Sequence, residues 1–365
     1  MAHQLYASLD EMLAPASLSA IEGRAVTGVR QEAFGSVDGL SGARFLRITT
    51  EPEPYHRYVL KRIAWGWDWI MRLTDDVQCR AVVTWQEGLL DRLPAEIVHG
   101  VRATAADGVG WAMLIDDFGD AMIPPGDEWI SPDDNRVLLD GMAATDATFW
   151  GQTALADPAR GYMPLLARYL ELSPGRARTE LESGEPVPPM VIKGWELLPT
   201  LVEPDVFGPM ARLIEDPAPL AMALARYPQT VIHGDWKLGN LGILREASSH
   251  APTTRIVLLD WATIGPAPPA VDLAWYLAVN SARLPVSKEE TIGLFEAALW
   301  RRLGAAFDPA WWEPSLKLAL LGGFLQLCWP KALGAALGDT EAVRARELAE
   351  LAWWSARVRE ALPLL

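Results

Sequence analysis

One stretch of the chain, near residue 235, carries polar residues at a spacing that could bind a metal ion and accept a proton. Residues 231–244 read VIHGDWKLGNLGIL, and residues 255–261 read RIVLLDW. The apolar runs 241–244 and 256–259 predict two short strands, joined by a polar turn that contains a proline. In an antiparallel hairpin the start of the first strand lies beside the end of the second. Asn240 and Asp260 would then lie side by side, roughly 5 Å apart.

The oxygen atoms of these side chains suit a hard cation. An amide oxygen next to a carboxylate is a suitable pair of ligands for Mg²⁺, which keeps several waters and binds substrate phosphates as well. Asp235 lies five residues before Asn240, on the loop that leads into the hairpin. A carboxylate beside metal-bound phosphates can take the proton of a hydroxyl acceptor. The segment therefore favours phosphoryl-transfer chemistry.

The full pattern resembles a known family. HGDxxxxN, followed twenty residues later by an apolar strand and Asp, resembles the catalytic and metal motifs of the aminoglycoside phosphotransferase/choline kinase superfamily. The continuation GPAPPAVDLA at 265–274 is similar to that family's Gly-Pro…Asp-Leu-Ala segment. The resemblance implies a protein-kinase-like fold, with Asp235 as the catalytic base and Asn240 and Asp260 as Mg²⁺ ligands.

The same resemblance implies a nucleotide site in the first third of the chain. The glycine-rich segment 34–42 precedes a predicted strand and would serve as the phosphate loop, through Gly39, Ser41 and Gly42. Lys61, on the following strand, would contact the α- and β-phosphates of ATP or GTP.

A carboxylate to hold this lysine and a hinge to bind adenine are also required. Many family members carry the carboxylate early in the next helix, where this chain has Cys79-Arg80-Ala81. Glu87 is the only glutamate in the predicted helix 77–93, so we assign it, with an exposed helical acid as the alternative. Asp116 lies in the step 114–117, which resembles the hinge.

Four neighbours of the motif have roles that the sequence leaves open. We expect the His233 ring to bind backbone, and Asp272 to cap its helix or brace the loop. Lys237 could reach a phosphate or remain solvated, and Trp236 could stack on an acceptor.

The elements that must position these residues change in kind along the chain. Strand-like runs occupy 45–49, 58–63 and 111–115, whereas helices dominate after Ser131-Pro132, a strong helix start. We therefore predict an α+β, two-lobed protein-kinase-like fold. Its small β-rich N-terminal nucleotide-binding lobe would span 1–118. A larger, mainly helical C-terminal lobe, 119–365, would carry the catalytic loop and the acceptor site.

Composition limits the partners. The 365 residues include 32 Lys and Arg against 47 Asp and Glu, a net charge of −15. Such a charge repels nucleic acid, and it mildly favours a cationic or amine-bearing small-molecule acceptor. Cys79 and Cys328 lie far apart, which argues against a disulfide scaffold and a structural zinc site.

The sequence also gives an expected location. The N-terminus lacks the basic-then-apolar pattern of a signal peptide. The longest apolar stretch, 316–329, is too short to span a bilayer and predicts a fully buried helix. We expect a cytoplasmic protein with no membrane partner.

Together these features predict an ATP- or GTP-dependent O-phosphotransferase that acts on a hydroxyl of a small molecule such as an amino sugar, an aminoglycoside or an amino alcohol. A Ser/Thr protein kinase is disfavoured, because no Asp-Phe-Gly follows the loop and no activation-segment pattern follows Asp260. The alternative from another class is a nucleotide-binding pseudokinase with a regulatory role.

Overall fold

The computed structural model describes residues 3–33, 35, 41–246 and 253–365, which form two compact units. The first unit comprises Met1–Arg72, Asp76–Gly126 and Leu238–Ala262. The second unit comprises Leu73–Asp75, Asp127–Lys237 and Thr263–Leu365. The predicted boundaries, 1–118 and 119–365, differ from this division chiefly at Leu238–Ala262, which joins the first unit.

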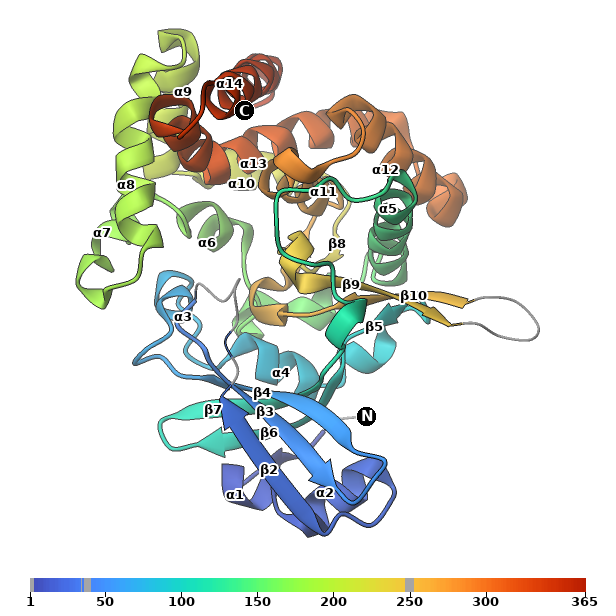
Figure 1. Ribbon diagram of the computed structural model, residues 1–365. Helices are drawn as coiled ribbons and strands as arrows, with labels where there is room; N and C mark the ends of the chain where they lie inside the picture. Colours follow the sequence, from blue (N-terminus) through green and yellow to red (C-terminus); the bar gives the residue numbers. More distant parts are fainter. Residues whose placement is uncertain (1–2, 34, 36–40, 247–252) are drawn as a thin grey trace. The chain divides into compact units, whose positions relative to one another are not determined.

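A six-stranded sheet forms the framework of the first unit, with the strand order β1-β6-β7-β4-β3-β2 (Figure 1). Its strands are β1 Leu5–Tyr6, β2 Gly28–Ala33, β3 Arg44–Glu51, β4 His56–Ile63, β6 Val101–Asp107 and β7 Gly110–Asp116. All neighbours are antiparallel except β1 and β6. The three strand-like runs of the sequence are the central strands β3, β4 and β7.

One face of this sheet buries the core of the first unit. Ile48, Leu60 and Leu114 are completely buried and come from the three central strands. They pack in one cluster with Met12 and Leu18, from the helices α1 Leu9–Met12 and α2 Pro15–Glu22. Because side chains alternate along a strand, this packing fixes which residues of β4 point away from the cluster, Lys61 among them.

The predicted hairpin is confirmed. β9 Leu241–Glu246 and β10 Thr253–Leu258 are antiparallel, with Leu241 opposite Leu258 (Figure 1). β10 also pairs in parallel with β5 Ile97–Val98. Both strands are longer than the apolar runs that predicted them, and residues 247–252 of the turn lie outside the described part of the chain.

Helices dominate the second unit. They are α5 Pro132–Thr148, α6 Leu165–Leu170, α7 Pro174–Arg178, α8 Val187–Leu197, α9 Pro204–Glu215, α10 Ala218–Leu224, α11 Ala270–Val279, α12 Lys288–Leu303, α13 Pro309–Leu337 and α14 Glu341–Ala361. Its one described sheet pairs β8 Thr230–Ile232 with β11 Gly265–Ala267 in antiparallel fashion. Two short helices outside this group follow β4 along the chain: α3 Trp69–Leu73, most of which belongs to the first unit, and α4 Arg80–Gln86, which lies within it.

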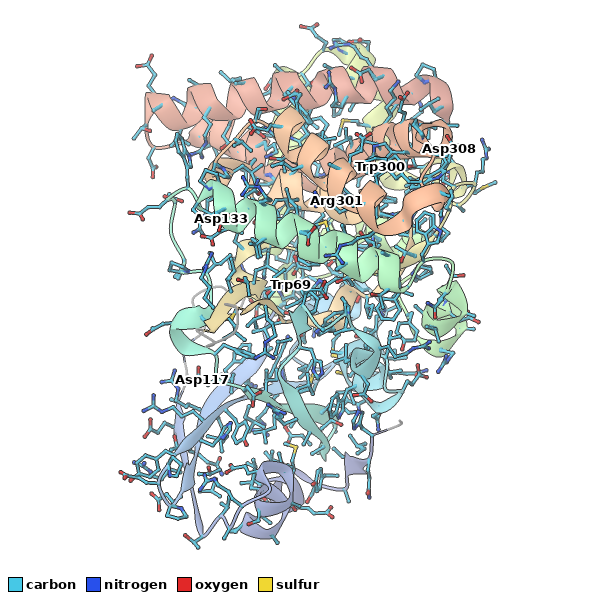
Figure 2. All side chains as sticks on the ribbon, turned by 90° about the vertical axis from the view of Figure 1, so that its right-hand side faces the viewer. Trp69, Asp117, Asp133, Trp300, Arg301 and Asp308 are labelled. Atoms are coloured by element: carbon cyan, nitrogen blue, oxygen red, sulfur yellow. The ribbon has the colours of Figure 1, made fainter. Side chains whose placement is uncertain are left out.

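The first helix of the second unit begins where the sequence predicts. The hydroxyl of Ser131 accepts a hydrogen bond from the amide of Asp134 at 3.0 Å, and this caps α5. Asp133 lies in the first turn of α5, and Arg301 lies on α12 beside that helix (Figure 2). Arg301 pairs with Asp140 of α5 at 3.0 Å.

Helix α13 is longer than the apolar stretch 316–329 and has 29 residues. It is the one helix in the described ranges that is long and apolar enough to cross a membrane, and 83% of its most apolar window is buried inside the protein. The fully buried helix that was predicted is therefore present. A break in helical geometry at Leu327 precedes Pro330, as expected where a proline removes a backbone hydrogen bond.

Candidate active site

Lys61 is a buried cation on the central strand β4 of the first unit. Its side-chain nitrogen donates a hydrogen bond to Oδ1 of Asp260 at 2.9 Å, and only 8% of the residue is exposed. Burial by itself lowers the pKa of Lys61, but the charge and hydrogen bond of Asp260 and the charge of Asp68 outweigh it and raise the pKa above its ordinary value. Lys61 is therefore held as a cation by carboxylates.

Asp68 is a second carboxylate near Lys61, and the sequence did not single it out. It is 4% exposed, and its Oδ1 accepts a hydrogen bond from the amide of Met71 at 3.0 Å in the first turn of α3. Burial raises the pKa of Asp68 to about 6, against the opposing effects of this hydrogen bond, of the charge on Lys61 and of a hydrogen bond with the Ser41 side chain. The carbonyl of Ser41 also accepts from the amide of Trp69 at 3.0 Å.

Glu87 does not hold Lys61, contrary to the sequence assignment. Helix α4 is shorter than the predicted 77–93, so Glu87 is an exposed residue at its C-terminal end. Early in α4 lies the buried Arg80, whose amide donates to the Asp76 carboxylate at 2.8 Å. The Arg80 guanidinium donates to the carbonyl of Ala262. Arg80 thus anchors the backbone two residues after Asp260.

The hairpin brings Asn240 and the Asp260 segment together. The amide of Leu259 donates to the carbonyl of Asn240 at 3.0 Å, which extends the ladder one residue past Leu241 and Leu258. Asp260 is thus one residue beyond the position opposite Asn240, rather than directly beside it. Its φ of +65° is left-handed, a conformation that aspartate tolerates better than most residues.

Asn240 and Asp260 have the chemistry to hold a cation such as Mg²⁺. Each can bind a metal through oxygen, Asn240 through its amide Oδ1 and Asp260 through its carboxylate; Asn240 is 6% exposed, and the Asp260 side chain is 28% exposed. Within the residues that the structure describes, no cluster of three or more His, Cys, Asp or Glu could hold a metal ion. The donor set fits a cation that takes its other ligands from water and phosphate.

The loop that carries Asp235 lies in the second unit, and hydrogen bonds to its backbone hold it in place. Gly234 has a φ of +90°, and a Cβ there would lie 2.3 Å from the Arg168 guanidinium and 2.6 Å from the Thr263 carbonyl. Arg168, on α6 and 2% exposed, donates to the Gly234 carbonyl at 3.1 Å and also to the Thr263 carbonyl. A larger residue than glycine would displace this arginine.

Asp272, near the start of α11, holds the same loop from the amide side. Its carboxylate accepts from the amides of His233 at 3.0 Å and Gly234 at 2.7 Å, and from the Trp236 indole at 2.9 Å. Burial raises the pKa of Asp272 to about 6, although the Arg168 charge and these donors lower it. The loop-bracing role expected for Asp272 is confirmed.

The side chain of Asp235 has partners of its own. Its Oδ1 accepts a hydrogen bond from the indole nitrogen of Trp275 on α11 at 2.8 Å, and its amide donates to Nδ1 of His233 at 3.1 Å. Lys237 lies farther off, with its nitrogen 3.9 Å from Oδ2 of Asp235. The expectation that His233 binds backbone is confirmed.

A model of the phosphotransferase enzyme family matches residues 37–314 of the chain. The chain belongs to this family. No curated protein sequence gives a match.

Solved structures of small-molecule kinases resemble this phosphotransferase. An ethanolamine kinase from Plasmodium vivax is 10% identical, with a TM-score of 0.50, over 90% of this chain and 84% of its own. A choline kinase from Streptococcus pneumoniae is 15% identical, with a TM-score of 0.47, over 95% of this chain and 98% of its own. A macrolide 2'-phosphotransferase from Brachybacterium faecium is 17% identical, with a TM-score of 0.44, over 92% and 95%.

The fold class predicted from the sequence is confirmed: the phosphotransferase is α+β, with an N-terminal sheet and a mainly helical C-terminal part, as in kinase-like structures. The family establishes the reaction class, a small-molecule kinase. At these identities the solved structures show the fold alone.

The remaining predicted nucleotide contacts of the phosphotransferase are the glycine-rich loop and Asp116. The glycine-rich loop connects β2 and β3; Ser41 and Gly42 are described, and Gly39 lies outside the described residues. The amide of Asp116 donates to the Gly100 carbonyl at 2.9 Å, so it is not the donor that would bind adenine. The Asp116 carboxylate pairs instead with Arg102 at 2.7 Å.

Sequence reasoning missed three residues that contact the site, namely Asp68, Arg168 and Trp275. One signal could have found Asp68: an acid between two tryptophans, in Trp67-Asp68-Trp69, indicates burial and hence a partner. Trp236, by contrast, is fully buried and donates to Asp272, so it does not face an acceptor as considered from the sequence.

Proposed function

We propose that this phosphotransferase transfers the γ-phosphoryl group of ATP or GTP, with Mg²⁺, to a hydroxyl of a small molecule that bears an amine. The observation that carries the proposal is the ion pair between buried Lys61 and Asp260, on the hairpin that also carries Asn240. A buried cation next to oxygen ligands is what a metal–nucleotide complex requires: a positive group for its phosphates and ligands for its metal.

On the donor side, the proposal gives each residue a separate task. Lys61 binds the α- and β-phosphates, with Asp68 and Asp260 keeping its nitrogen charged and in place. Asn240 and Asp260 would hold Mg²⁺, which supplies neutralisation of charge on the phosphate oxygens when bound. Ser41 and Gly42 lie at the described end of the glycine-rich loop and would contribute to phosphate binding.

On the acceptor side, Asp235 orients the hydroxyl and takes its proton. The acceptor oxygen forms a bond to the γ-phosphorus, the bond from that phosphorus to the bridging oxygen breaks, and the nucleoside diphosphate leaves with that electron pair. The hydroxyl proton moves to the Asp235 carboxylate. Because the transition state of such transfers is loose, orientation of the hydroxyl contributes as much as removal of its proton.

The net charge of −15 supports an amine-bearing acceptor, because a negative protein attracts cations over a distance set by ionic strength. The candidate acceptors of this kind are amino alcohols, amino sugars and aminoglycosides.

Turnover assays on the purified protein test the proposal. ATP and GTP are each supplied with Mg²⁺ and with a panel of amino alcohols, amino sugars and aminoglycosides, and each amine is matched by its neutral hydroxyl analogue. We expect phosphorylation of at least one amine, lost in EDTA and restored by Mg²⁺, with the analogue a poorer substrate. Full activity in EDTA contradicts the metal assignment, and preference for the analogue contradicts the acceptor class.

We also propose that the protein acts in the cytoplasm, where nucleoside triphosphates are available. Cys79 and Cys328 are buried thiols without a disulfide, which suits a reducing compartment. Fractionation of cells that express the tagged chain should recover it with cytoplasmic markers; recovery with secreted proteins contradicts this location.

A further inference from the structure

Trp275 presents a hydrogen-bond donor to the carboxylate of Asp235. The distance from its indole nitrogen to Oδ1 is 2.8 Å, within the range of a charge-assisted hydrogen bond. An indole has one N–H, which lies in the plane of a rigid ring, so its direction is fixed once the ring is packed. Lys237, at 3.9 Å from Oδ2, is beyond hydrogen-bond distance and sets no comparable direction.

The helix that carries Trp275 is itself firmly held. On α11, the buried Tyr276 donates from its hydroxyl to Oδ1 of Asn135 on α5 at 2.8 Å. Near the C-terminal end of the helix, the buried Lys331 donates to the carbonyl of Ala278 at 3.2 Å. The indole of Trp275 is thus attached to an element with little freedom to move.

One face of α11 serves the catalytic loop twice. Asp272 and Trp275 are three residues apart, and such residues are neighbours on a helix surface. Asp272 binds the backbone amides of His233 and Gly234, whereas Trp275 binds the side chain of Asp235. Asp272 therefore fixes the backbone path of the loop, and Trp275 helps to fix the orientation of the Asp235 carboxylate.

We infer that Trp275 is a positioning residue for phosphoryl transfer, which orients the Asp235 carboxylate toward the acceptor hydroxyl. The inference rests on the proposed role of Asp235. The terminal torsion of an aspartate is broad, and the N–H of Trp275 restricts it by holding one carboxylate oxygen in a fixed direction. A reacting group that is misplaced by a small angle loses much of the advantage of proximity.

The test removes the N–H while keeping the ring. In the full-length enzyme, Trp275→Phe, and the isosteric replacement of Trp275 by benzothienylalanine, should each lower kcat by roughly tenfold. We expect nucleotide affinity, measured by calorimetry, to stay within about twofold, because Trp275 acts on the acceptor side. Trp275→His, which retains a ring N–H, should recover part of the loss.

Tyr276→Phe is the matched control. It removes one buried hydrogen bond from the same helix without touching Asp235, so it reports the effect of loosening α11 alone. A fall in kcat as large as that of Trp275→Phe would show that the tryptophan has only a structural role and would overturn the inference. An unchanged kcat for the benzothienylalanine enzyme would do the same.

A double-mutant cycle separates this inference from the proposed function. If Trp275 acts through Asp235, Trp275→Phe has no further effect on turnover in the Asp235→Asn background. An undiminished additional loss there contradicts the inference while the role of Asp235 stands. If Asp235→Asn alone leaves turnover unchanged, the proposed function itself fails.

Discussion

The Lys61 site and the Asp235 loop are stabilised in opposite ways. In the first unit, Lys61 and Asp260 hold each other, and both are groups that the proposed substrates would contact. In the second unit, the loop of Asp235 is held by Asp272 and Arg168, which bind its backbone. The first arrangement can exchange a protein partner for a ligand, whereas the groups that hold the second are bound to backbone and are not ones that the proposed substrates would contact.

The difference between the two regions predicts different consequences of mutation. Substitutions in the Lys61 site should alter nucleotide binding, and loss of Lys61 should also lower stability, because buried carboxylates then lose their cation. Substitutions in the backbone supports of the Asp235 loop should reduce stability, whereas substitutions of Asp235 and of Trp275, which orients its carboxylate, should reduce turnover and leave nucleotide binding nearly unchanged.

The largest effects are expected for Asp260 and Asp235, one in each of the two regions. Asp235→Asn should lower turnover by roughly 10²–10⁴, the usual range for loss of a general base. Its nucleotide affinity by calorimetry should stay within a few fold, because the isosteric amide leaves the Lys61 site unchanged. Asp260→Ala should weaken both magnesium-nucleotide binding and turnover. If instead Asp235→Asn abolished nucleotide binding and Asp260→Ala did not, the two roles would be reversed.

A second prediction concerns the stability of the loop. Gly234→Ala should lower the free energy of unfolding by about 2–4 kcal/mol, from left-handed strain at φ +90° and displacement of the buried Arg168. Denaturant titration without ligand measures it. Gly184→Ala is the control in the same unit, because Gly184 also has a positive φ, +78°, but its Cβ would meet nothing within 4 Å. Equal losses at the two glycines would show that Arg168 does not constrain the loop.

The Lys61 site gives a third prediction. Lys61→Ala should reduce kcat/KM at least roughly tenfold, or about 1.4 kcal/mol, because a contact that positions the phosphates is lost. Glu87→Gln, at the exposed end of α4, should remain within about twofold of the unchanged enzyme. A large effect at Glu87 would restore the assignment made from sequence and set aside Asp68.

Local patterns made some of these features predictable. Asn240 comes directly before β9 and Asp260 follows β10 by two residues, so their proximity follows from the pairing of the two apolar runs. The phosphate loop, Lys61 and Asp235 were assigned from motif spacing, which is also a property of short segments, and their roles stay predictions. The fold class followed from the change from strand-like to helical patterns along the chain.

Contacts between distant segments were not predictable. Trp275 is 40 residues from Asp235, and Arg168 is 66 residues from Gly234. The assignment of Glu87 failed because α4 ends at Gln86: Gly88 has a left-handed φ of +69°, and the amides of Gly88 and Leu89 donate back to the carbonyls of Trp85 and Thr84. Both the supports of the loop and the partner of Lys61 depend on which side chains become buried together.

The smallest expected effect concerns a buried acid behind the loop. Asp146, on α5, is 1% exposed, and its Oδ2 is buried without a hydrogen-bond partner. Burial, together with the charge of Asp272, raises the pKa of Asp146 well above its ordinary value of 3.8. Asp272 accepts three hydrogen bonds in its charged form, so Asp146 is the member of the pair that stays protonated.

This difference predicts how stability changes with pH. An acid whose pKa is raised on folding binds more protons in the folded state, so its contribution to stability is lost as pH rises above its unfolded pKa, near 4. Asp146→Asn replaces the protonated acid by a neutral group of the same shape and removes this loss. We therefore expect the variant to gain stability relative to the unchanged protein between pH 4 and pH 7, as measured by denaturant unfolding at several pH values. Asp140→Asn, which removes an ion-paired acid from the same helix, should show no such gain. If the Asp146→Asn variant instead lost stability relative to the unchanged protein as pH rose, the Asp146 carboxylate would be charged and paired in the folded protein, contrary to the protonated state inferred for it.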